Sequence, residues 1–241
     1  QWISISVVAL LSGMLGSTLY TAALGQVQYI PYSVVVLLQQ LNPVFAIAMA
    51  AILLREKLTK KFILLAVVAL IGAYMTTFPS LIVNFDSGAG TVMAAVLAIG
   101  AAASWGTATA FSKYALKGTS FIHVTAIRFA LAPVFALLFT IGTGQISAIT
   151  SLSLEQFGYL MAITLSTGLV ALVIYYYGLQ RITASKAAVL GLVRPLAAVI
   201  IGWVFLSQGL TWTQALGAGL LLTATVIVAR SNDRVDARSD V

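Results

Sequence analysis

Apolar residues form long runs along this chain, and short segments with glycine, proline and polar residues separate them. An α-helix rises about 1.5 Å per residue, so a run of roughly 20 residues crosses a hydrocarbon core of about 30 Å. We therefore predict an all-α membrane protein, a polytopic helical bundle. The predicted transmembrane segments are 3–24, 32–54, 62–79, 91–114, 121–141, 157–179, 184–206 and 213–230.

The composition excludes a soluble domain. Hydrophobic residues make up 61% of the 241 residues and charged residues 8%, whereas soluble proteins have about 25% charged residues. The net charge of +7 comes from basic residues scattered between apolar runs, which is unlike a nucleic-acid-binding surface. We therefore expect no nucleic-acid partner. The chain has no cysteine, which excludes disulfides and cysteine-ligated metals.

Positive charge gathers on one side of the predicted membrane domain. When the segments are threaded alternately, every Lys and Arg except Arg128 and Arg194 falls on one face. By the positive-inside rule this face is cytoplasmic, and both termini lie there. We predict an integral protein of a bacterial or archaeal cytoplasmic (inner) membrane. The polar stretch 231–241 carries charges of both signs and is expected to be a disordered cytoplasmic tail.

Two of the predicted segments share a motif. Pro43–Thr59 aligns without a gap on Pro195–Thr211, with identical residues at the Pro43, Ala46, Leu54, Leu58 and Thr59 positions of the first copy. The first copy contains the charged sequence Arg-Glu-Lys at 55–57, and the second has Ser-Gln-Gly at 207–209. An inverted duplication accounts for this loss of charge, because the two copies then end on opposite faces of the membrane.

The duplication divides the chain into two repeats of unequal length. The first, at 1–80, contains three predicted segments, and the second, at 90–230, contains five. We expect the first repeat to lack two N-terminal helices of the parent protein. The sequence would then show eight transmembrane helices of ten.

In this order the motifs resemble those of the EamA family in the drug/metabolite transporter (DMT) superfamily, over about residues 3–230. The resemblance implies a ten-helix secondary transporter, built from two inverted five-helix repeats around a central substrate cavity. The chain departs from the family pattern at Gln208, where Glu is usual, and in lacking the first two helices. The motifs are Tyr20–Leu24, Pro43 and Leu54–Thr59 in the first repeat, and Trp105-Gly106, Lys113–Leu116, Ile127–Phe129 and Pro195–Thr211 in the second.

Arg194 is the main candidate for substrate binding. It lies near the middle of the segment 184–206, where a cation usually faces a polar interior and has a partner. The six acidic residues all lie in loops, at segment ends or in the tail. An anionic group of a substrate is one partner for Arg194. Backbone carbonyls freed by Pro195, or an acid on the absent helices, are the alternatives.

Gln39 and Asn42 share one helix face because they are three residues apart. In the repeat they match Gly191 and Arg194. A pseudo-two-fold axis would bring all four residues to one central cavity. We expect them to bind substrate, and the alternative is hydrogen bonding between helices.

Trp105 is a further substrate-binding candidate, either stacking on a ligand or filling space between helices. The residues expected to act in gating or in structure are prolines that bend their helices, an arginine that reaches the interface, and interfacial tyrosines of which one hydrogen-bonds inward. They are Pro43, Pro195, Arg128, Tyr20 and Tyr176.

No catalytic motif, metal-ligand cluster or phosphate loop is present in the sequence, so we predict neither an enzyme nor a cofactor. Our hypothesis is a secondary transporter that moves an amino acid or organic anion by alternating access, in the direction of efflux. The alternative is a non-transporting membrane scaffold or sensor. The expected partners are a small-molecule substrate and the lipid bilayer. A homodimer is the oligomeric state to test.

Overall fold

The computed structural model describes residues 1–26, 32–78, 80–81, 89–146, 152–205, 209 and 211–231. Within these ranges the chain forms helices and no strand, which confirms the predicted helical bundle. The elements are α1 (Trp2–Val8), η1 (Ala9–Leu15), α2 (Gly16–Leu24), α3 (Tyr32–Gln39), α4 (Asn42–Leu53), α5 (Lys60–Thr77), α6 (Ala89–Ala115), α7 (Phe121–Gly142), α9 (Leu154–Ile163), η2 (Thr164–Val170), α10 (Ala171–Leu179), α11 (Ala184–Leu190), α12 (Val193–Phe205) and α13 (Trp212–Arg230).

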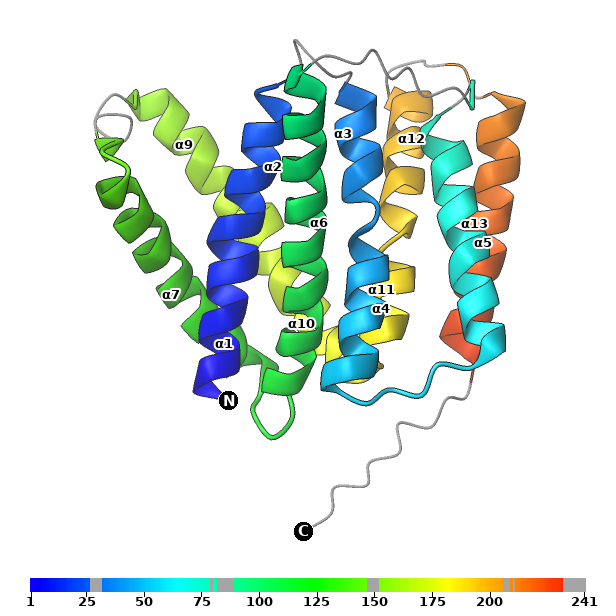
Figure 1. Cartoon of the computed structure of the whole chain (residues 1–241), viewed down its shortest axis with the longest axis horizontal. Coiled ribbons are helices and arrows are strands. Elements are labelled where there is room, and N and C mark those ends of the chain that lie inside the picture. Colours follow the sequence, from blue (N-terminus) through cyan, green and yellow to red (C-terminus); the bar gives the residue numbers. More distant parts are fainter. Residues whose placement is uncertain are drawn as a thin grey trace.

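The helices lie side by side along a common direction (Figure 1). Seven helical segments of the described chain are long and apolar enough to cross a membrane. The remaining predicted segment, 184–206, is divided into α11 and α12. Two spans contain a π-helical turn: η1 joins α1 to α2, and η2 joins α9 to α10.

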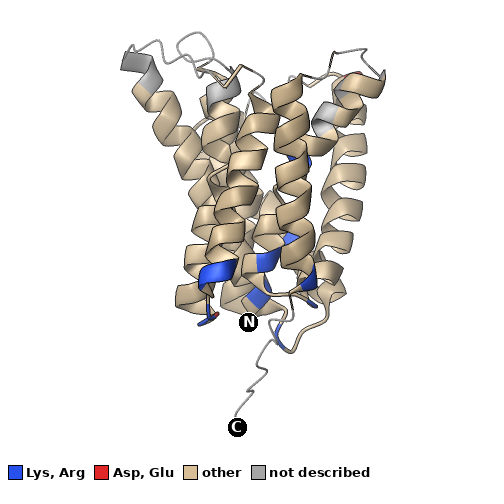
Figure 2. Cartoon of the chain, turned by 90° about the vertical axis from the view of Figure 1, so that its right-hand side faces the viewer, with Lys and Arg blue, Asp and Glu red and all other residues tan. Residues whose placement is uncertain are grey.

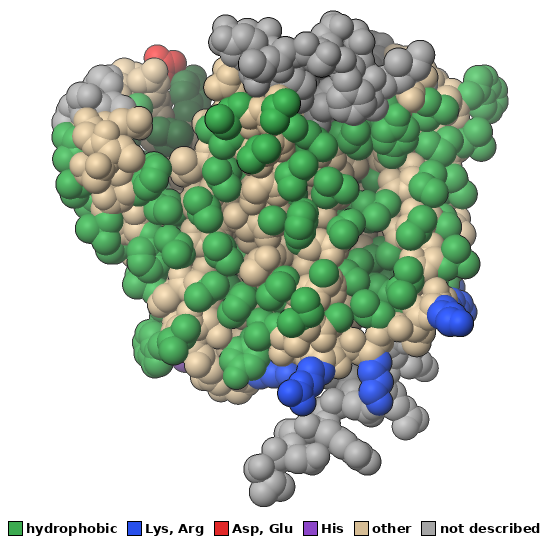
Figure 3. Space-filling view, in the orientation of Figure 1, with side chains coloured by type: hydrophobic (Ala, Val, Ile, Leu, Met, Phe, Trp, Pro, Cys, Tyr) green, Lys and Arg blue, Asp and Glu red, His purple; other side chains and the backbone are tan. Residues whose placement is uncertain are grey.

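Charge and hydrophobicity are distributed as a bilayer requires. The Lys and Arg residues gather toward one end of the bundle, which we call the basic end (Figure 2). Apolar side chains cover the middle of the visible face (Figure 3). The N-terminus and the last turn of α13 both lie at the basic end (Figure 1). The predicted tail 231–241 lies outside the described residues beyond Ser231.

The two proline-bearing spans run in opposite directions. α3 precedes α4 toward the basic end, and α11 precedes α12 away from it (Figure 1). Both spans are broken shortly before their proline, at residues 40–41 and 191–192. A proline has no N–H for the carbonyl four residues earlier, so the helix is weakened at these positions. This antiparallel course is the arrangement that an inverted duplication requires.

The last helices of the two repeats, α5 and α13, pack closely through glycines. A Cβ atom on Gly72 would lie 2.8 Å from the carbonyl oxygen of Gly217, and one on Gly217 would lie 2.6 Å from Cβ of Met75. Both positions therefore require glycine. Small residues at helix contacts are typical of membrane bundles.

Glu56 joins the two repeats at the basic end. Its carboxylate accepts hydrogen bonds from the backbone N–H groups of Ala184 and Ser185, at 2.8 and 3.1 Å, and from Oγ of Ser185 at 2.6 Å. It thus satisfies N–H groups that the first turn of a helix leaves unpaired. Arg55, with φ of 53°, ends α4 and turns the chain toward this contact. Gln208, the repeat counterpart of Glu56, lies outside the described residues.

An apolar cluster packs at the same end, beneath the centre of the bundle. It joins α1, α6, α7, α10 and α11. With Glu56 it closes the basic end of the bundle. Its buried members are Ile5, Ala115, Leu116, Val124, Tyr176, Leu179 and Ala187.

Candidate binding cavity

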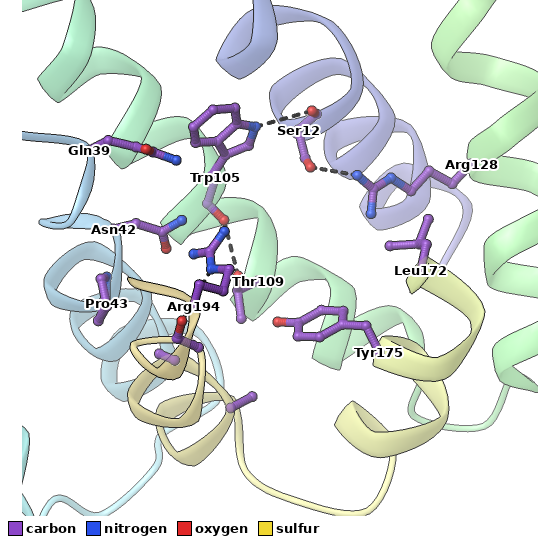
Figure 4. A pocket seen from close by; sticks show the side chains of 13 residues that line it. Ser12, Gln39, Asn42, Pro43, Trp105, Thr109, Arg128, Leu172, Tyr175 and Arg194 are labelled. Atoms are coloured by element: carbon purple, nitrogen blue, oxygen red, sulfur yellow. Dashed lines mark hydrogen bonds between the residues drawn. The ribbon is translucent and has the colours of Figure 1, made fainter. Parts of the chain in front are cut away.

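A cavity of about 410 Å³ lies where the two broken spans meet (Figure 4). Both repeats contribute to its walls. The first contributes η1, α3 and α4, and the second contributes α6, α7, α10, α11 and α12. Every residue predicted to bind substrate lines it. The lining residues are Ser12, Gln39, Asn42, Pro43, Trp105, Thr109, Arg128, Leu172, Tyr175, Ala187, Ala188, Gly191 and Arg194.

Arg194 points into this cavity rather than toward the outside of the bundle (Figure 4). Its Nε donates to the carbonyl oxygen of Gly191 at 3.1 Å. This is the carbonyl that the N–H of residue 195 would bind in a regular helix, and Pro195 has no N–H to offer. The backbone alternative therefore accounts for one nitrogen of the guanidinium. Its two terminal Nη atoms have no acceptor among the described residues.

The amides of Gln39 and Asn42 face the same space (Figure 4). Both side chains are half-buried, and neither makes a hydrogen bond to another described residue. A polar group in such a place needs a partner, because a buried amide without one is unfavourable. The alternative of hydrogen bonding between helices finds no support in these two residues. Water or a solute in the cavity is the available partner.

No described carboxylate lies in the cavity. The acids within the described residues are Glu56, which binds the start of α11, and Glu155, which lies in the first turn of α9. Neither residue lines the cavity. The site therefore presents a cation and two amides to whatever fills it.

Arg128 also lines the cavity, but its guanidinium is held by the protein. One Nη donates to the hydroxyl of Tyr176 at 2.8 Å, and the other to Oγ of Ser12 at 2.5 Å. The Tyr176 hydroxyl also lies 2.9 Å from Oγ of Ser112. The network joins η1, α6, α7 and α10. The expectation that Arg128 reaches outward to the membrane interface is wrong, because neutral oxygens inside the bundle bind it.

The tyrosines do not form the interfacial belt that the sequence indicated. Tyr176 is fully buried, and Tyr20 packs against Trp105 with ring centroids 5.4 Å apart. Tyr175 lines the cavity. Tyr177 is exposed, and its ring lies under the guanidinium of Arg181. Consecutive helical residues point about 100° apart. Three neighbouring tyrosines therefore lie at the cavity, in the buried interior and on the outside of the bundle.

The sequence analysis missed three polar cavity residues, Ser12, Thr109 and Tyr175. The available signal was a polar side chain deep within an apolar run. That signal does not say which face of a helix points inward. In η1 the π-helical turn also rotates the residues that follow it, and nothing in the sequence indicates this turn.

A second cavity, of about 760 Å³, is continuous with the first. The two share Ser12, Arg128, Leu172, Tyr175 and Arg194. The second extends between α7 and the η2 region toward the end of the bundle opposite the basic end. Its walls there are mostly apolar, with Thr164 and Thr167 as polar exceptions. The second cavity therefore extends the space around Arg194 away from the basic end.

Comparison with known proteins shows several similar chains. The riboflavin transporter ImpX of Fusobacterium nucleatum is 33% identical over 228 residues, which cover 93% of this chain and 75% of ImpX. The uncharacterized transporter YoaV of Bacillus subtilis is 28% identical over 179 residues, 74% of this chain and 60% of YoaV. A solved crystal structure of another protein matches the fold with a TM-score of 0.71 at 18% identity, over 95% of this chain and 75% of its own.

The profile of the EamA-like transporter family matches residues 1–78 and 92–230. This match includes both copies of the proline motif, and it confirms the resemblance inferred from the sequence. The family and the named relatives are transporters rather than enzymes. The chain belongs to the EamA-like transporter family and is an integral membrane protein.

Proposed function

We propose that this protein is a secondary transporter that moves a small organic solute with an anionic group, such as an organic acid or amino acid, through the central cavity. The observation that carries the proposal is the guanidinium of Arg194, which faces the cavity and whose two terminal nitrogens have no acceptor within the part of the chain that the structure describes. The expected direction is efflux.

The chemistry of the cavity favours an anion. A guanidinium presents parallel N–H groups that match the two oxygens of a carboxylate, and such charge-assisted hydrogen bonds are strong. The amides of Gln39 and Asn42 offer both donors and acceptors beside it. A cationic solute is disfavoured, because the described lining contains no carboxylate and two arginines.

Transport by alternating access follows from the arrangement of the repeats. Inverted repeats commonly bind a solute at their interface and rock about it. Here the contacts of Glu56 and the apolar cluster hold the basic end together. We propose that the basic end faces the cytoplasm, as the positive-inside rule indicates, in a bacterial or archaeal inner membrane.

We further propose that the whole protein has ten helices. The span formed by α9, η2 and α10 is mostly exposed, and α9 has no buried residue. In the first repeat the matching span, formed by α1, η1 and α2, packs against α6 and α7. Two helices of the first repeat would cover α9 and η2 in the same way, since the repeats are related by a pseudo-two-fold axis.

Riboflavin is a second candidate solute, because ImpX is named as a riboflavin transporter. The flavin ring has two carbonyls flanking an N–H along one edge. Arg194 and the two amides offer donors and acceptors suited to such an edge. The aromatic residues Trp105 and Tyr175 line the same cavity. A flavin and a carboxylate therefore compete for the same polar groups in this proposal.

The proposal is tested with the full-length protein in lipid vesicles. Labelled amino acids, organic acids and riboflavin are followed in both directions across the membrane. For the solute that is transported, we expect Arg194→Ala to lower the apparent affinity at least tenfold, since hydrogen bonds to a charged group are lost. The matched control is Arg181→Ala, which removes an arginine outside the cavity and should leave transport unchanged.

Two results would contradict the proposal. Unchanged transport in Arg194→Ala would remove the assigned role of this residue. Absence of transport of all these solutes by correctly folded protein would favour the alternative, a membrane scaffold or sensor.

A further inference from the structure

Trp105 is fixed in place by three contacts on one side of the cavity. Its indole Nε1 donates to the backbone carbonyl oxygen of Ser12 at 3.3 Å. Tyr20 packs against it at 5.4 Å with the rings inclined by 57°. Gly16 lies so close that a Cβ atom there would be 2.6 Å from Nε1 and 2.8 Å from Cδ1 of the indole. The indole is thus held against η1 and α2 by Ser12, Gly16 and Tyr20, and we call these three residues the seat of Trp105.

The seat depends on the π-helical turn η1. A π-helical turn interrupts the regular α-helical hydrogen-bond pattern, and such turns are frequent at functional sites. Ser12 lies inside this turn, and Gly16 begins α2 directly after it. Ser12 accepts a hydrogen bond from Trp105 with its backbone carbonyl and one from Arg128 with its hydroxyl.

Trp105 both packs between helices and borders the cavity. Trp105 is half-buried, and it lines the central cavity above Arg194 (Figure 4). Tyr175 points into the cavity from α10, across from α6 (Figure 4). The polar side chains of Gln39, Asn42 and Arg194 line the same cavity as the indole (Figure 4). The cavity thus combines an aromatic platform with a polar edge that donates hydrogen bonds.

We propose that the solute carries a planar aromatic or heteroaromatic ring, which stacks on Trp105 while its anionic or carbonyl edge binds Arg194. Gly16 and the Ser12 carbonyl act as positioning groups for the indole. This inference rests on the proposed transport function and narrows its solute class. Aromatic rings stack in offset or inclined geometries, and an immobile indole orders one face of such a site in advance.

A pair of probes with equal charge distinguishes the contribution of an aromatic ring to binding from that of the anionic group. Benzoate and cyclohexanecarboxylate have the same carboxylate and the same number of carbons, but only benzoate is flat. All tryptophans of the full-length protein other than Trp105 are replaced by Phe, and the quenching of Trp105 fluorescence reports binding. We expect benzoate to bind roughly three- to tenfold more tightly, the range that aromatic pairs contribute.

Variants of the seat sharpen this test. Trp105→Leu, followed by competition against the transported solute, should abolish the preference for benzoate and keep carboxylate binding. Gly16→Ala should lower the preference, because the added methyl group collides with the indole. Gly178→Ala is the matched control, since no atom lies within 4 Å of the added Cβ.

The possible failures are distinguishable. Equal affinity of the two probes in the parent protein, with both affinities dependent on Arg194, would overturn the ring inference and leave the proposed function standing. Binding of both probes that does not depend on Arg194 would overturn the proposed function. If neither probe binds at millimolar concentration, the ring inference is wrong, and the transport assay decides the proposed function.

Discussion

The two broken spans share a backbone plan and differ in chemistry. In each, a helix is interrupted shortly before a proline, and the residues beside the break line the central cavity. The α3–α4 span contributes the neutral amides of Gln39 and Asn42. The α11–α12 span contributes Gly191 and Arg194 at the matching positions. The duplication has thus kept the geometry of the break, while the side chains have diverged into one uncharged and one cationic half.

The breaks are also supported in different ways. At the first, Nε2 of Gln40 donates to Oγ1 of Thr77 at 2.7 Å, which ties the break to α5. At the second, the residue matching Gln40 is Leu192, which is 4% exposed and belongs to a core cluster with α5 and α13. A hydrogen bond supports one break, and apolar packing supports the other. The two breaks therefore differ both in the side chains that face the cavity and in the contacts that hold each break in place.

The largest expected effect is on the packed break. Leu192→Ala should destabilise the protein by about 2–5 kcal/mol, because it removes a buried side chain and leaves a cavity. The measurement is thermal or chemical unfolding of the full-length protein in detergent. Leu216→Ala on α13 is a matched control, because Leu216 is 62% exposed. Equal losses in the two variants would show that Leu192 does not support the break.

An intermediate effect is expected when the charge is moved between the two spans. Arg194→Asn should weaken binding of the transported solute by about ten- to a hundredfold, because hydrogen bonds to a charged group contribute about 1.5–3 kcal/mol. Adding Asn42→Arg returns a guanidinium to the same cavity from the other span, and should recover part of the loss. Solute affinity is measured by competition for transport. A double variant no better than Arg194→Asn would show that the two faces are not interchangeable.

The smallest effect is expected at the hydrogen-bonded break. Gln40→Ala should lower stability by about 0.6 kcal/mol, the average for a side-chain hydrogen bond between membrane helices. The double-mutant cycle with Thr77→Ala measures this coupling in the same unfolding assay. A coupling as large as the loss in Leu192→Ala would remove the contrast between the two supports.

Much of the fold could be predicted from the sequence because hydrophobicity alone requires helices in a bilayer. The predicted ends of the span 121–141 differ by one residue from α7, Phe121–Gly142. The prolines indicated a bend, and before Pro43 the α-helix is interrupted by a turn at residues 40–41. The residues of the proline motif could be placed at the cavity, since a duplicated motif and an inverted axis fix their positions together.

The rest of the site depends on helix rotation, which apolar runs do not encode. These helices are apolar on nearly all sides, so no apolar stripe shows which face points inward. The positions of Ser12 and Thr109 within their helices therefore did not reveal that they face the cavity. The inward course of Arg128 depends on Tyr176, which lies 48 residues later in the sequence. Only the packed structure brings these groups together.

If the protein works by the proposed alternating access, the carboxylate of Glu56 favours the conformation in which the basic end is closed. Moving α4 away from α11 at the basic end would leave two backbone N–H groups and one hydroxyl without their acceptor, the Glu56 carboxylate. Water would then have to replace it. A solute can offset this bias only by the amount by which it binds the opposite conformation more tightly. In the proposed cycle, these three hydrogen bonds of Glu56 help to keep the empty protein closed at the basic end and so limit leakage through it.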